Sequence, residues 1–280
     1  MNKSTIPTAL TIAGSDSGGG AGLQADIKAF QANGVYGMSV VTSITAQNTQ
    51  GVTAAFNLPT QIITAQIDAV ADDFEIHVVK TGMLSTSDII HTVADAIERH
   101  ELGPVVVDPV MVATSGDRLL DPNAVEVLKS RMLPAANLLT PNAHEAEVLA
   151  GFPVTILDDA RRAAETILAL GPKAVLVTGG HLEGEVDAVD ALIDAEGEML
   201  FRAERIDTKN THGTGCTYAS AIAANLAKGY NLRRAIQEAK AYLTEAIRHS
   251  LSIGRGHGPT HHFWFLEGDE AVPKRSGRLR

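Results

Sequence analysis

The segment Thr211-His-Gly-Thr-Gly-Cys-Thr217 places two glycines one residue apart, directly before a run of good helix formers. Such glycines let several backbone N–H groups point at one spot, and the positive end of the helix dipole adds to the same field. A loop of this kind can hold a phosphoryl group during its transfer, so Gly213, Thr214 and Gly215 are candidates for an anion hole. An ordinary loop with Thr214 or Thr217 as the helix N-cap is the alternative, and it explains this segment taken alone.

Cys216, the single cysteine of the chain, stands at or beside the start of the same helix. A helix N-terminus lowers the pKa of a thiol, so we expect the pKa of Cys216 to lie below its usual value. The thiolate can then serve as a base. A lone cysteine is more often a small buried apolar side chain, and that alternative stays open at this point.

A second glycine-rich segment, Gly14-Ser-Asp-Ser-Gly-Gly-Gly-Ala-Gly22, lies between a predicted strand that ends at Ala13 and a helix that begins near Leu23. Its glycines allow a ligand to approach the backbone closely. A flexible linker is the alternative, but a linker does not fit between a first strand and the first helix. No Gly-Lys-Ser/Thr follows, so the segment is not a P-loop.

Two further side chains could contact a flat heterocycle. Gln47 lies in a polar segment after the second predicted strand, and its amide can pair with both the ring nitrogen and the exocyclic amine of an aminopyrimidine. Met83 follows a later strand and could lie against an aromatic ring. The alternative for Gln47 is a polar residue that lines a turn, and the alternative for Met83 is a methionine in the core. For either residue type taken alone, the alternative is the more common role.

Three polar residues suggest a metal site. Asp108 ends a predicted strand, where open α/β sheets place their ligands, and Asn142 and Glu145 stand three apart on one face of a helix start. Mg²⁺ that is bound to a nucleotide needs only one or two protein carboxylates. Asn142 with Glu145 is also a capping-box pattern. We favour the metal because Asp108 is independently expected at the same edge of the sheet.

Lys240 falls on the apolar stripe of a late helix, and this spacing alone does not decide between an inward-facing ammonium and one that snorkels to the surface. The histidines His257, His261 and His262 suggest zinc at first sight. Their spacing fits no closed structural zinc site and no cysteine stands near them, so we predict that they are structural.

Strand-like and helical segments alternate along the whole chain, which predicts an α/β fold with a mostly parallel sheet that is covered by helices on both faces. An antiparallel hairpin and two helices are expected to follow. The predicted strands are Ala9–Ala13, Met38–Ile44, Ile76–Lys80, Val105–Asp108, Leu138–Thr140, Ala174–Val177 and the hairpin pair Val186–Ile193 and Glu198–Ile206, and the last two helices are Gly215–Lys228 and Leu232–His249. No linker, charge block or repeat divides the chain, so residues 1–280 are predicted to form one domain with a frayed tail at 274–280.

Composition narrows the partners. The formal charge of -10 and the isoelectric point of 5.4 argue against nucleic acid or an anionic membrane as the main partner. The first twenty residues lack the pattern of a signal peptide, and no apolar run reaches the length of a membrane span. One cysteine allows no internal disulfide, which fits a reducing cytoplasm.

From about Thr8 to Phe263, these segments together resemble the hydroxymethylpyrimidine and phosphomethylpyrimidine kinases of thiamine synthesis, members of the ribokinase-like superfamily. Most of that superfamily carries Gly-x-Gly-Asp in its anion hole, with the aspartate as base. Here Cys216 stands in the place of the aspartate, which is the form of the pyrimidine kinases. A second departure is Thr178, which stands where many members have lysine and puts the phosphate contact at this position in doubt.

The resemblance implies roles for residues that spacing alone does not assign. It implies an acceptor pocket, a nucleotide side, a Mg²⁺ site and a homodimer. The acceptor pocket comprises Gly14, Ala21, Gln47, Met83 and Val110; the nucleotide side comprises Thr178, Gly180 and Lys240; and the Mg²⁺ site comprises Asp108, Asn142 and Glu145.

The implied reactions use ATP to convert 4-amino-5-hydroxymethyl-2-methylpyrimidine to its monophosphate and then to its diphosphate. A pyridoxal or pyridoxine kinase is the nearest alternative, because pyridoxal is also a flat nitrogen heterocycle with a hydroxymethyl group. A pyrimidine-sensing module that has lost catalysis is the alternative from another class. Asp108, Glu145 and the loop 213–216 argue against it.

Overall fold

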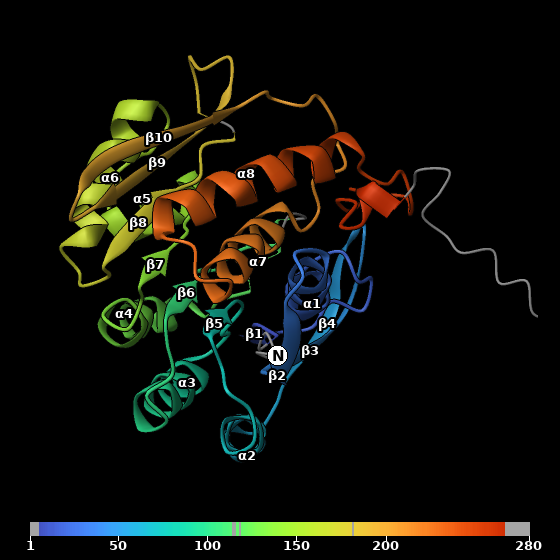
Figure 1. The fold of residues 1–280 in the computed structure, drawn as a ribbon, viewed down its shortest axis with the longest axis vertical. Coiled ribbons are helices and arrows are strands. Elements are labelled where there is room, and N and C mark those ends of the chain that lie inside the picture. Colours follow the sequence, from blue (N-terminus) through green and yellow to red (C-terminus); the bar gives the residue numbers. More distant parts are fainter. Residues whose placement is uncertain (1–5, 114–115, 118, 181, 267–280) are drawn as a thin grey trace, which may run out of the picture.

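The computed structural model describes residues 6–113, 116–117, 119–180 and 182–266. Their centre is a sheet in the strand order β10-β9-β8-β7-β6-β5-β1-β2, in which β9 and β10 run antiparallel to their neighbours and the other pairs are parallel (Figure 1). The strands are β1 (Thr8–Ala13), β2 (Tyr36–Val41), β5 (Val78–Thr81), β6 (Val105–Val107), β7 (Leu138–Leu139), β8 (Ala174–Val177), β9 (Ala188–Asp194) and β10 (Gly197–Ala203). The mostly parallel sheet is therefore confirmed.

Helices cover both faces of the sheet because the inner strands are apolar on both sides. One core lies under α1 (Gly22–Ala32), α7 (Thr214–Ala227) and α8 (Leu232–Arg248), of which α7 packs against both of the others. The other core lies under α2 (Thr60–Ala71), α3 (Ser87–Arg99), α5 (Ala143–Ala150) and α6 (Leu157–Leu168), with the short α4 (Val125–Val127) between a 3₁₀ turn, Pro122–Ala124, and a π turn, Leu128–Met132. A last 3₁₀ turn spans Trp264–Leu266.

The predicted strand Met38–Ile44 is wrong as a single element. The chain leaves the sheet at Thr42, whose N–H still donates to the carbonyl of Ala13, and then enters a separate two-stranded sheet of β3 (Ser43–Asn48) and β4 (Gly51–Asn57). The break falls at two polar residues, Thr42 and Ser43, which the predicted strand included in order to reach Ile44. In Figure 1, β3 and β4 stand beside α1, away from the middle of the main sheet.

The other predicted strands agree with the structure to within two or three residues at their ends, and Ala174–Val177 agrees at both. Both late helices are also confirmed. The single domain over residues 1–280 stays a prediction, and the tail at 274–280 lies outside the described residues. Within the described residues, none of the helices combines the length and hydropathy needed to cross a bilayer.

The parallel strands place the functional candidates. β1, β5, β6, β7 and β8 all end at the same edge of the sheet, and a candidate residue follows each of them within a few positions. Loops at the carboxyl ends of parallel strands are where open α/β sheets bind ligands. The residues that follow the five strands are Gly14, Met83, Asp108, Asn142 and Thr178.

Candidate active site

The first turn of α7 is open to an anion. Gly213 is its N-cap with φ of +80°, and no described side chain caps the helix, so neither Thr214 nor Thr217 fills the role that the alternative gave them. Built at Gly215, a Cβ would meet no described atom within 4 Å. The Thr214 N–H donates to the Thr211 carbonyl at 3.2 Å, whereas the space beside Gly215 is open, as an anion hole requires.

Cys216 is half-buried at this turn, between groups of opposite charge. The Asp108 carboxylate, the Lys80 ammonium and the backbone N–H of Gly22 at the start of α1 all lie close enough to the thiol to shift its pKa. Burial raises the pKa of the thiol above its usual value, and Asp108 raises it further, against the pull of Lys80. The expectation of a lowered pKa was wrong, because desolvation outweighs the helix N-terminus and the nearby ammonium.

A buried ion network lies beneath Cys216. The ammonium of Lys80, on β5, lies 2.9 Å from Asp26 Oδ1 and 3.3 Å from Asp108 Oδ2. Asp26 also accepts hydrogen bonds from Thr11, at 2.6 Å, and Ser220, at 2.7 Å. Despite the cost of burial, the two carboxylates raise the pKa of Lys80 above its usual value, so the ammonium stays charged.

Of the candidate metal ligands, Glu145 lies close enough to Asp108 for their charges to interact, and Asn142 is hydrogen-bonded to Glu145. Burial and the negative charge of Asp108 raise the pKa of Glu145 to about 8, and burial also raises the pKa of Asp108. The capping box is present as well. Asn142 Oδ1 accepts from the Glu145 N–H, and Glu145 Oε2 accepts from the Asn142 N–H, each at 2.9 Å. The alternative role is therefore confirmed, and it does not remove Glu145 from the neighbourhood of Asp108.

The residues predicted to bind the acceptor lie near the first glycine-rich segment and on β3. Gly14 makes room for Met83, because a Cβ on Gly14 would lie 2.1 Å from the Met83 methyl group. Ala21 is the N-cap of α1, and Gln47 lies at an irregularity of β3, where its Oε1 accepts from Thr45 at 3.3 Å. The structure places Met83 against Gly14. It also ties Gln47, on β3, to the same glycine loop, because the Ser17 hydroxyl donates to the Gln47 carbonyl at 2.7 Å and accepts from the Gln47 N–H at 2.8 Å.

Val110 lies on the loop after β6 and is half-buried, and its N–H donates to the Asp108 carbonyl at 2.9 Å. This bond places Val110 close to the catalytic edge of the sheet.

The nucleotide candidates lie on the next loops along the sheet. Thr178 bridges to Asn142, Gly180 is exposed, and His181 lies outside the described residues. Lys240 is 8% exposed and donates to Asp190 Oδ2 at 2.6 Å, so it faces inward and does not snorkel.

Asp190, on β9, connects Lys240 to this loop. Its Oδ1 accepts from the Gly179 N–H at 3.1 Å, and its Oδ2 also accepts from the Tyr218 hydroxyl at 2.9 Å. Lys240 therefore reaches the nucleotide side through Asp190.

Sequence reasoning missed five polar residues that shape the site. A charge inside a buried strand was the available signal for Lys80 and Asp190. Asp26 stands on the inner face of α1, and the glycine loop contains Asp16. His212 stands inside the anion-hole segment itself, yet its side chain was given no role.

His262 agrees with its predicted structural role. It is buried, and its Nε2 lies 3.0 Å from the Thr217 hydroxyl in the first turn of α7.

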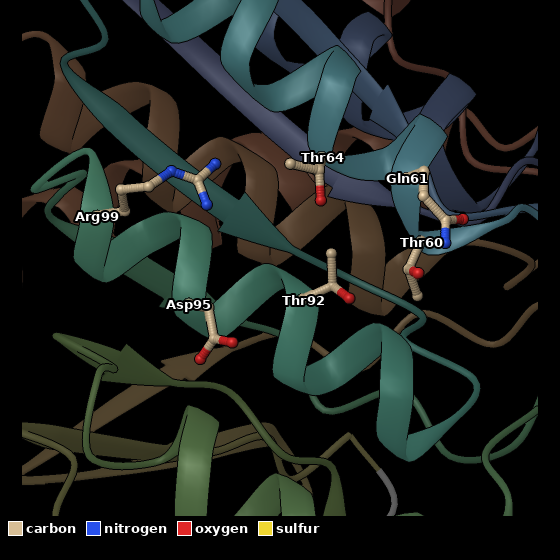
Figure 2. A pocket seen from close by; sticks show the side chains of 6 residues that line it. All are labelled: Thr60, Gln61, Thr64, Thr92, Asp95 and Arg99. Carbon is tan, nitrogen blue, oxygen red and sulfur yellow. The ribbon is translucent and has the colours of Figure 1, made fainter.

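A groove between α2 and α3 lies away from this edge and contains none of the predicted residues. Figure 2 shows Thr60, Gln61 and Thr64 on one wall and Thr92, Asp95 and Arg99 on the other. Its charged groups already have partners, since Arg99 pairs with Asp68, and Asp95 with Arg131. The groove therefore offers no free charge to a ligand.

The fold and the site define an α/β phosphotransferase of the ribokinase-like class. A structure with this fold is the ADP complex of pyridoxal kinase from Bacillus subtilis, which superposes with a TM-score of 0.87 at 41% identity, over 94% of this chain and 100% of that one.

The sequence model of the phosphomethylpyrimidine kinase family matches residues 16–261, and the chain belongs to that family. The hydroxymethylpyrimidine/phosphomethylpyrimidine kinase of Streptomyces coelicolor is 49% identical over 94% of this chain and 96% of its own. The enzyme of that name from Rhizobium meliloti is 52% identical over 91% of this chain and 96% of its own.

Proposed function

We propose that the protein uses ATP to phosphorylate 4-amino-5-hydroxymethyl-2-methylpyrimidine and then its monophosphate, which yields the diphosphate for thiamine synthesis. One observation carries the proposal: the thiol of Cys216, the carboxylate of Asp108 and the uncapped start of α7 meet at the carboxyl edge of the sheet. This is the constellation that a phosphoryl transfer to an alcohol needs. The names of the relatives supply the acceptor.

In the first step, the hydroxyl oxygen of the pyrimidine attacks the γ-phosphorus of ATP, the bond to ADP breaks, and the hydroxyl proton goes to a base. Cys216 is the proposed base. As the groups are arranged, the raised pKa keeps the thiol protonated, so Cys216 can serve as the base only after it has released its own proton to solvent. The loop of Gly213, Thr214 and Gly215 holds the charge on the transferred group, with the N–H groups of Gly213 and Gly215 as its donors, because the Thr214 N–H donates to the Thr211 carbonyl.

The second step uses the same loop with less help. A phosphate oxygen of the monophosphate is already anionic, so it needs no base to become a nucleophile. The loop after Gly213 and the start of α7 remain necessary because the transferred group carries the same charge in both steps. One site therefore serves both reactions.

The residues around Asp108 fit Mg²⁺. Asp108 and Glu145 are two buried carboxylates whose pKa values are raised, and a divalent cation would relieve the repulsion between their charged forms. Bound Mg²⁺ supplies neutralisation of phosphate charge. Asn142 lies beside them, but its Oδ1 is already engaged by the N–H of Glu145. Replacing Glu145 with glutamine should raise the Mg²⁺ concentration that ATP turnover requires.

The acceptor and nucleotide roles follow the order of the loops. Gln47 reads the ring nitrogen and amine of the pyrimidine, and Gly14, Ala21, Met83 and Val110 enclose the ring. Thr178, Gly180 and Lys240 form the nucleotide side in this proposal. Lys240 acts there through Asp190.

Residues of β3 and β4 support a homodimer. Ile44 and Phe56 face each other across the two strands and remain 52% and 64% exposed. An isolated two-stranded sheet is marginally stable in water, so a second copy that covers this apolar pair would stabilise it. The proposed location is the cytoplasm, where Cys216 stays reduced.

The test is an assay of ADP release with both pyrimidine substrates and pyridoxal. The proposal expects kcat/KM to be higher for the pyrimidines. Replacement of Gln47 by leucine should lower pyrimidine kcat/KM by about 10–10³-fold, because it leaves ligand polar groups unpaired, and should leave the KM for ATP unchanged. If neither pyrimidine supports ATP turnover, the result contradicts the proposal.

Pyridoxal phosphorylation is the second candidate, favoured by the similarity to the Bacillus subtilis pyridoxal kinase. Pyridoxal lacks the amine that Gln47 would read, so activity on it should fall less in the Gln47→Leu variant. If the Gln47→Leu variant loses more kcat/KM on pyridoxal than on the pyrimidines, the result favours pyridoxal as the substrate.

A further inference from the structure

Asp16 organises the first glycine loop although it follows the strand by only three residues. Its side chain is 1% exposed. Oδ1 accepts from the N–H of Gly18 at 2.8 Å, and Oδ2 accepts from Gly20 at 2.9 Å and Ala21 at 2.8 Å. One carboxylate therefore closes the loop on itself and fixes the residue that caps α1.

The same carboxylate joins a segment that is 196 residues away in the chain. His212 Nε2 lies 2.9 Å from Asp16 Oδ2, and both side chains are buried. An ionised carboxylate only accepts, so Nε2 carries the proton and donates it. His212 directly precedes Gly213, the N-cap of α7. The bond therefore connects residues 14–21, the acceptor loop, to residues 211–217, the phosphoryl loop.

The two loops also pack tightly against each other at Gly20 and Gly213. A Cβ on Gly20 would lie 2.4 Å from His212 Cδ2, and a Cβ on Gly213 would lie 1.8 Å from the Gly20 carbonyl oxygen. Gly213 also has a positive φ, which favours glycine. The backbones of the two loops are thus in direct contact, with the Asp16–His212 bond beside that contact.

The rest of the chain holds His212 from behind. Its N–H donates to the Gly258 carbonyl at 3.1 Å, and its carbonyl accepts from Thr260 at 3.4 Å. Burial opposes the charge on Asp16, but the bonds from His212, Ala21 and Gly18 outweigh it and hold the pKa of Asp16 below its usual value. The clamp is therefore charged and fixed on both sides.

We propose that Asp16 and His212 are positioning residues that set the acceptor loop and the phosphoryl loop at their working distance for both phosphorylation steps. Neither needs to touch the reacting atoms, because each acts through the loop that it holds. This inference rests on the proposed function, since it assigns one reactant to each loop. A positioning defect moves both reactants apart, so it differs from the loss of a base.

The variants separate the bond from the bulk of the side chain. His212→Leu removes the donor, whereas His212→Gln keeps an N–H at a similar reach. Asp16→Asn keeps the shape but presents an amide to donors. The control is His100→Leu, because His100 Nε2 also lies near an aspartate, Asp68 at 2.7 Å, but beside the groove remote from the site.

We expect His212→Leu to lower kcat about 10–100-fold, by the same factor with the pyrimidine and with its monophosphate, as for a displacement of the order of 1 Å. The KM for ATP should stay within about twofold, and His212→Gln should recover most of the activity. His100→Leu should match wild type. A folded His212→Leu protein with wild-type kcat, or a loss confined to the first step, would overturn the proposal.

Hydrogen exchange gives a readout that does not depend on the substrate. His212→Leu should speed amide exchange at Gly18, Gly20 and Ala21, although the substitution lies in the other loop. Unchanged exchange at these amides overturns the clamp. If wild type turns over neither pyrimidine, the proposed function fails, and exchange still decides whether the loops are coupled. If His212→Leu does not fold, His212→Gln against Asp16→Asn decides the same question, since only the latter should speed exchange.

Discussion

Two loops are proposed to carry the two sides of the candidate site, and they differ in how they are held. The acceptor loop, residues 14–21, is closed by three backbone bonds to Asp16 and tied to the start of α7 by His212. The nucleotide loop, residues 178–180, is held by the bond from Thr178 to Pro141 and the bond from Gly179 to Asp190. At Gly180 a Cβ would meet no described atom within 4 Å.

The difference indicates where binding energy is spent. A loop that is already ordered loses little entropy when a ligand arrives, so the acceptor side can discriminate between small rings by shape and hydrogen bonds. The proposed nucleotide loop has open space beside Gly180, which the polar groups of ATP would enter. Substitutions on the acceptor side should therefore affect stability and kcat, and those on the nucleotide side mainly the KM for ATP.

The largest effect is expected below the acceptor loop. Lys80→Met leaves the buried carboxylates of Asp26 and Asp108 without their cation, which should lower the free energy of unfolding by about 3–5 kcal/mol. Urea denaturation measures it. The control is Arg99→Met, which removes an exposed pair with Asp68 and should cost at most about 1 kcal/mol. If both variants lose the same free energy of unfolding, burial of the Lys80 ion pairs does not add to their contribution to stability.

The next effect separates the two reactions. Cys216→Ser keeps the loop but replaces the thiol, and it should lower the rate of the first step by about 10²–10⁴-fold, the usual range for a general base. The second step should lose less, because its nucleophile is already charged. Single-turnover rates with each acceptor provide the measurement. Equal losses would mean that Cys216 acts through its position, as His212 is proposed to do.

A smaller effect depends on pH. Burial lowers the pKa of His262 to about 4, with Lys28 and His261 adding to the shift. Between about pH 4 and the usual value near 6.5, the unfolded chain binds a proton that the folded protein does not. His262 therefore makes the free energy of unfolding fall as the pH drops through this window. His262→Gln should lose about 1–3 kcal/mol less than wild type there. Parallel profiles from urea unfolding would exclude this role.

The smallest effect is expected on the nucleotide side. Thr178→Lys restores the residue that many members of the superfamily carry, and its ammonium should strengthen ATP binding by about 0.5–1 kcal/mol, a two- to fivefold lower KM. The kcat should stay within about twofold. Thr178→Val is the matched control without the charge. A rise in KM for ATP in the lysine variant would show that the open loop has another use for this position.

Sequence patterns predicted the elements that depend on local burial. Ala174–Val177 is a continuous apolar run buried on both faces, and its bounds were predicted to the residue. The break at Thr42 was missed because two polar residues, Thr42 and Ser43, are too short an interruption to separate two strands by pattern, while the turn is set by hydrogen bonds from Thr42 to the carbonyls of Ala13 and Met83. Long-range bonds of this kind leave no periodic signal.

The site divides in the same way. Asp108 directly follows a strand, and Glu145 and Cys216 stand in the first turn of a helix. These are positions at which α/β sheets present side chains to ligands, so the sequence made them candidates. Lys80 and Asp190 were missed because their partners, Asp26 and Lys240, lie about fifty residues away and meet them only in the fold. The direction of the Cys216 pKa was wrong for a related reason, since desolvation depends on packing that the sequence does not display.

The distance in sequence between Asp16 and His212 has a consequence for synthesis on the ribosome. β1 pairs with β2 and β5, so the amino-terminal part of the sheet can form while the rest of the chain is still being made. The clamp cannot close until α7 and residues 258–260 have left the exit tunnel. A nascent chain should therefore hold a folded sheet with an unfinished site, and catalytic competence should arise only with the last helices.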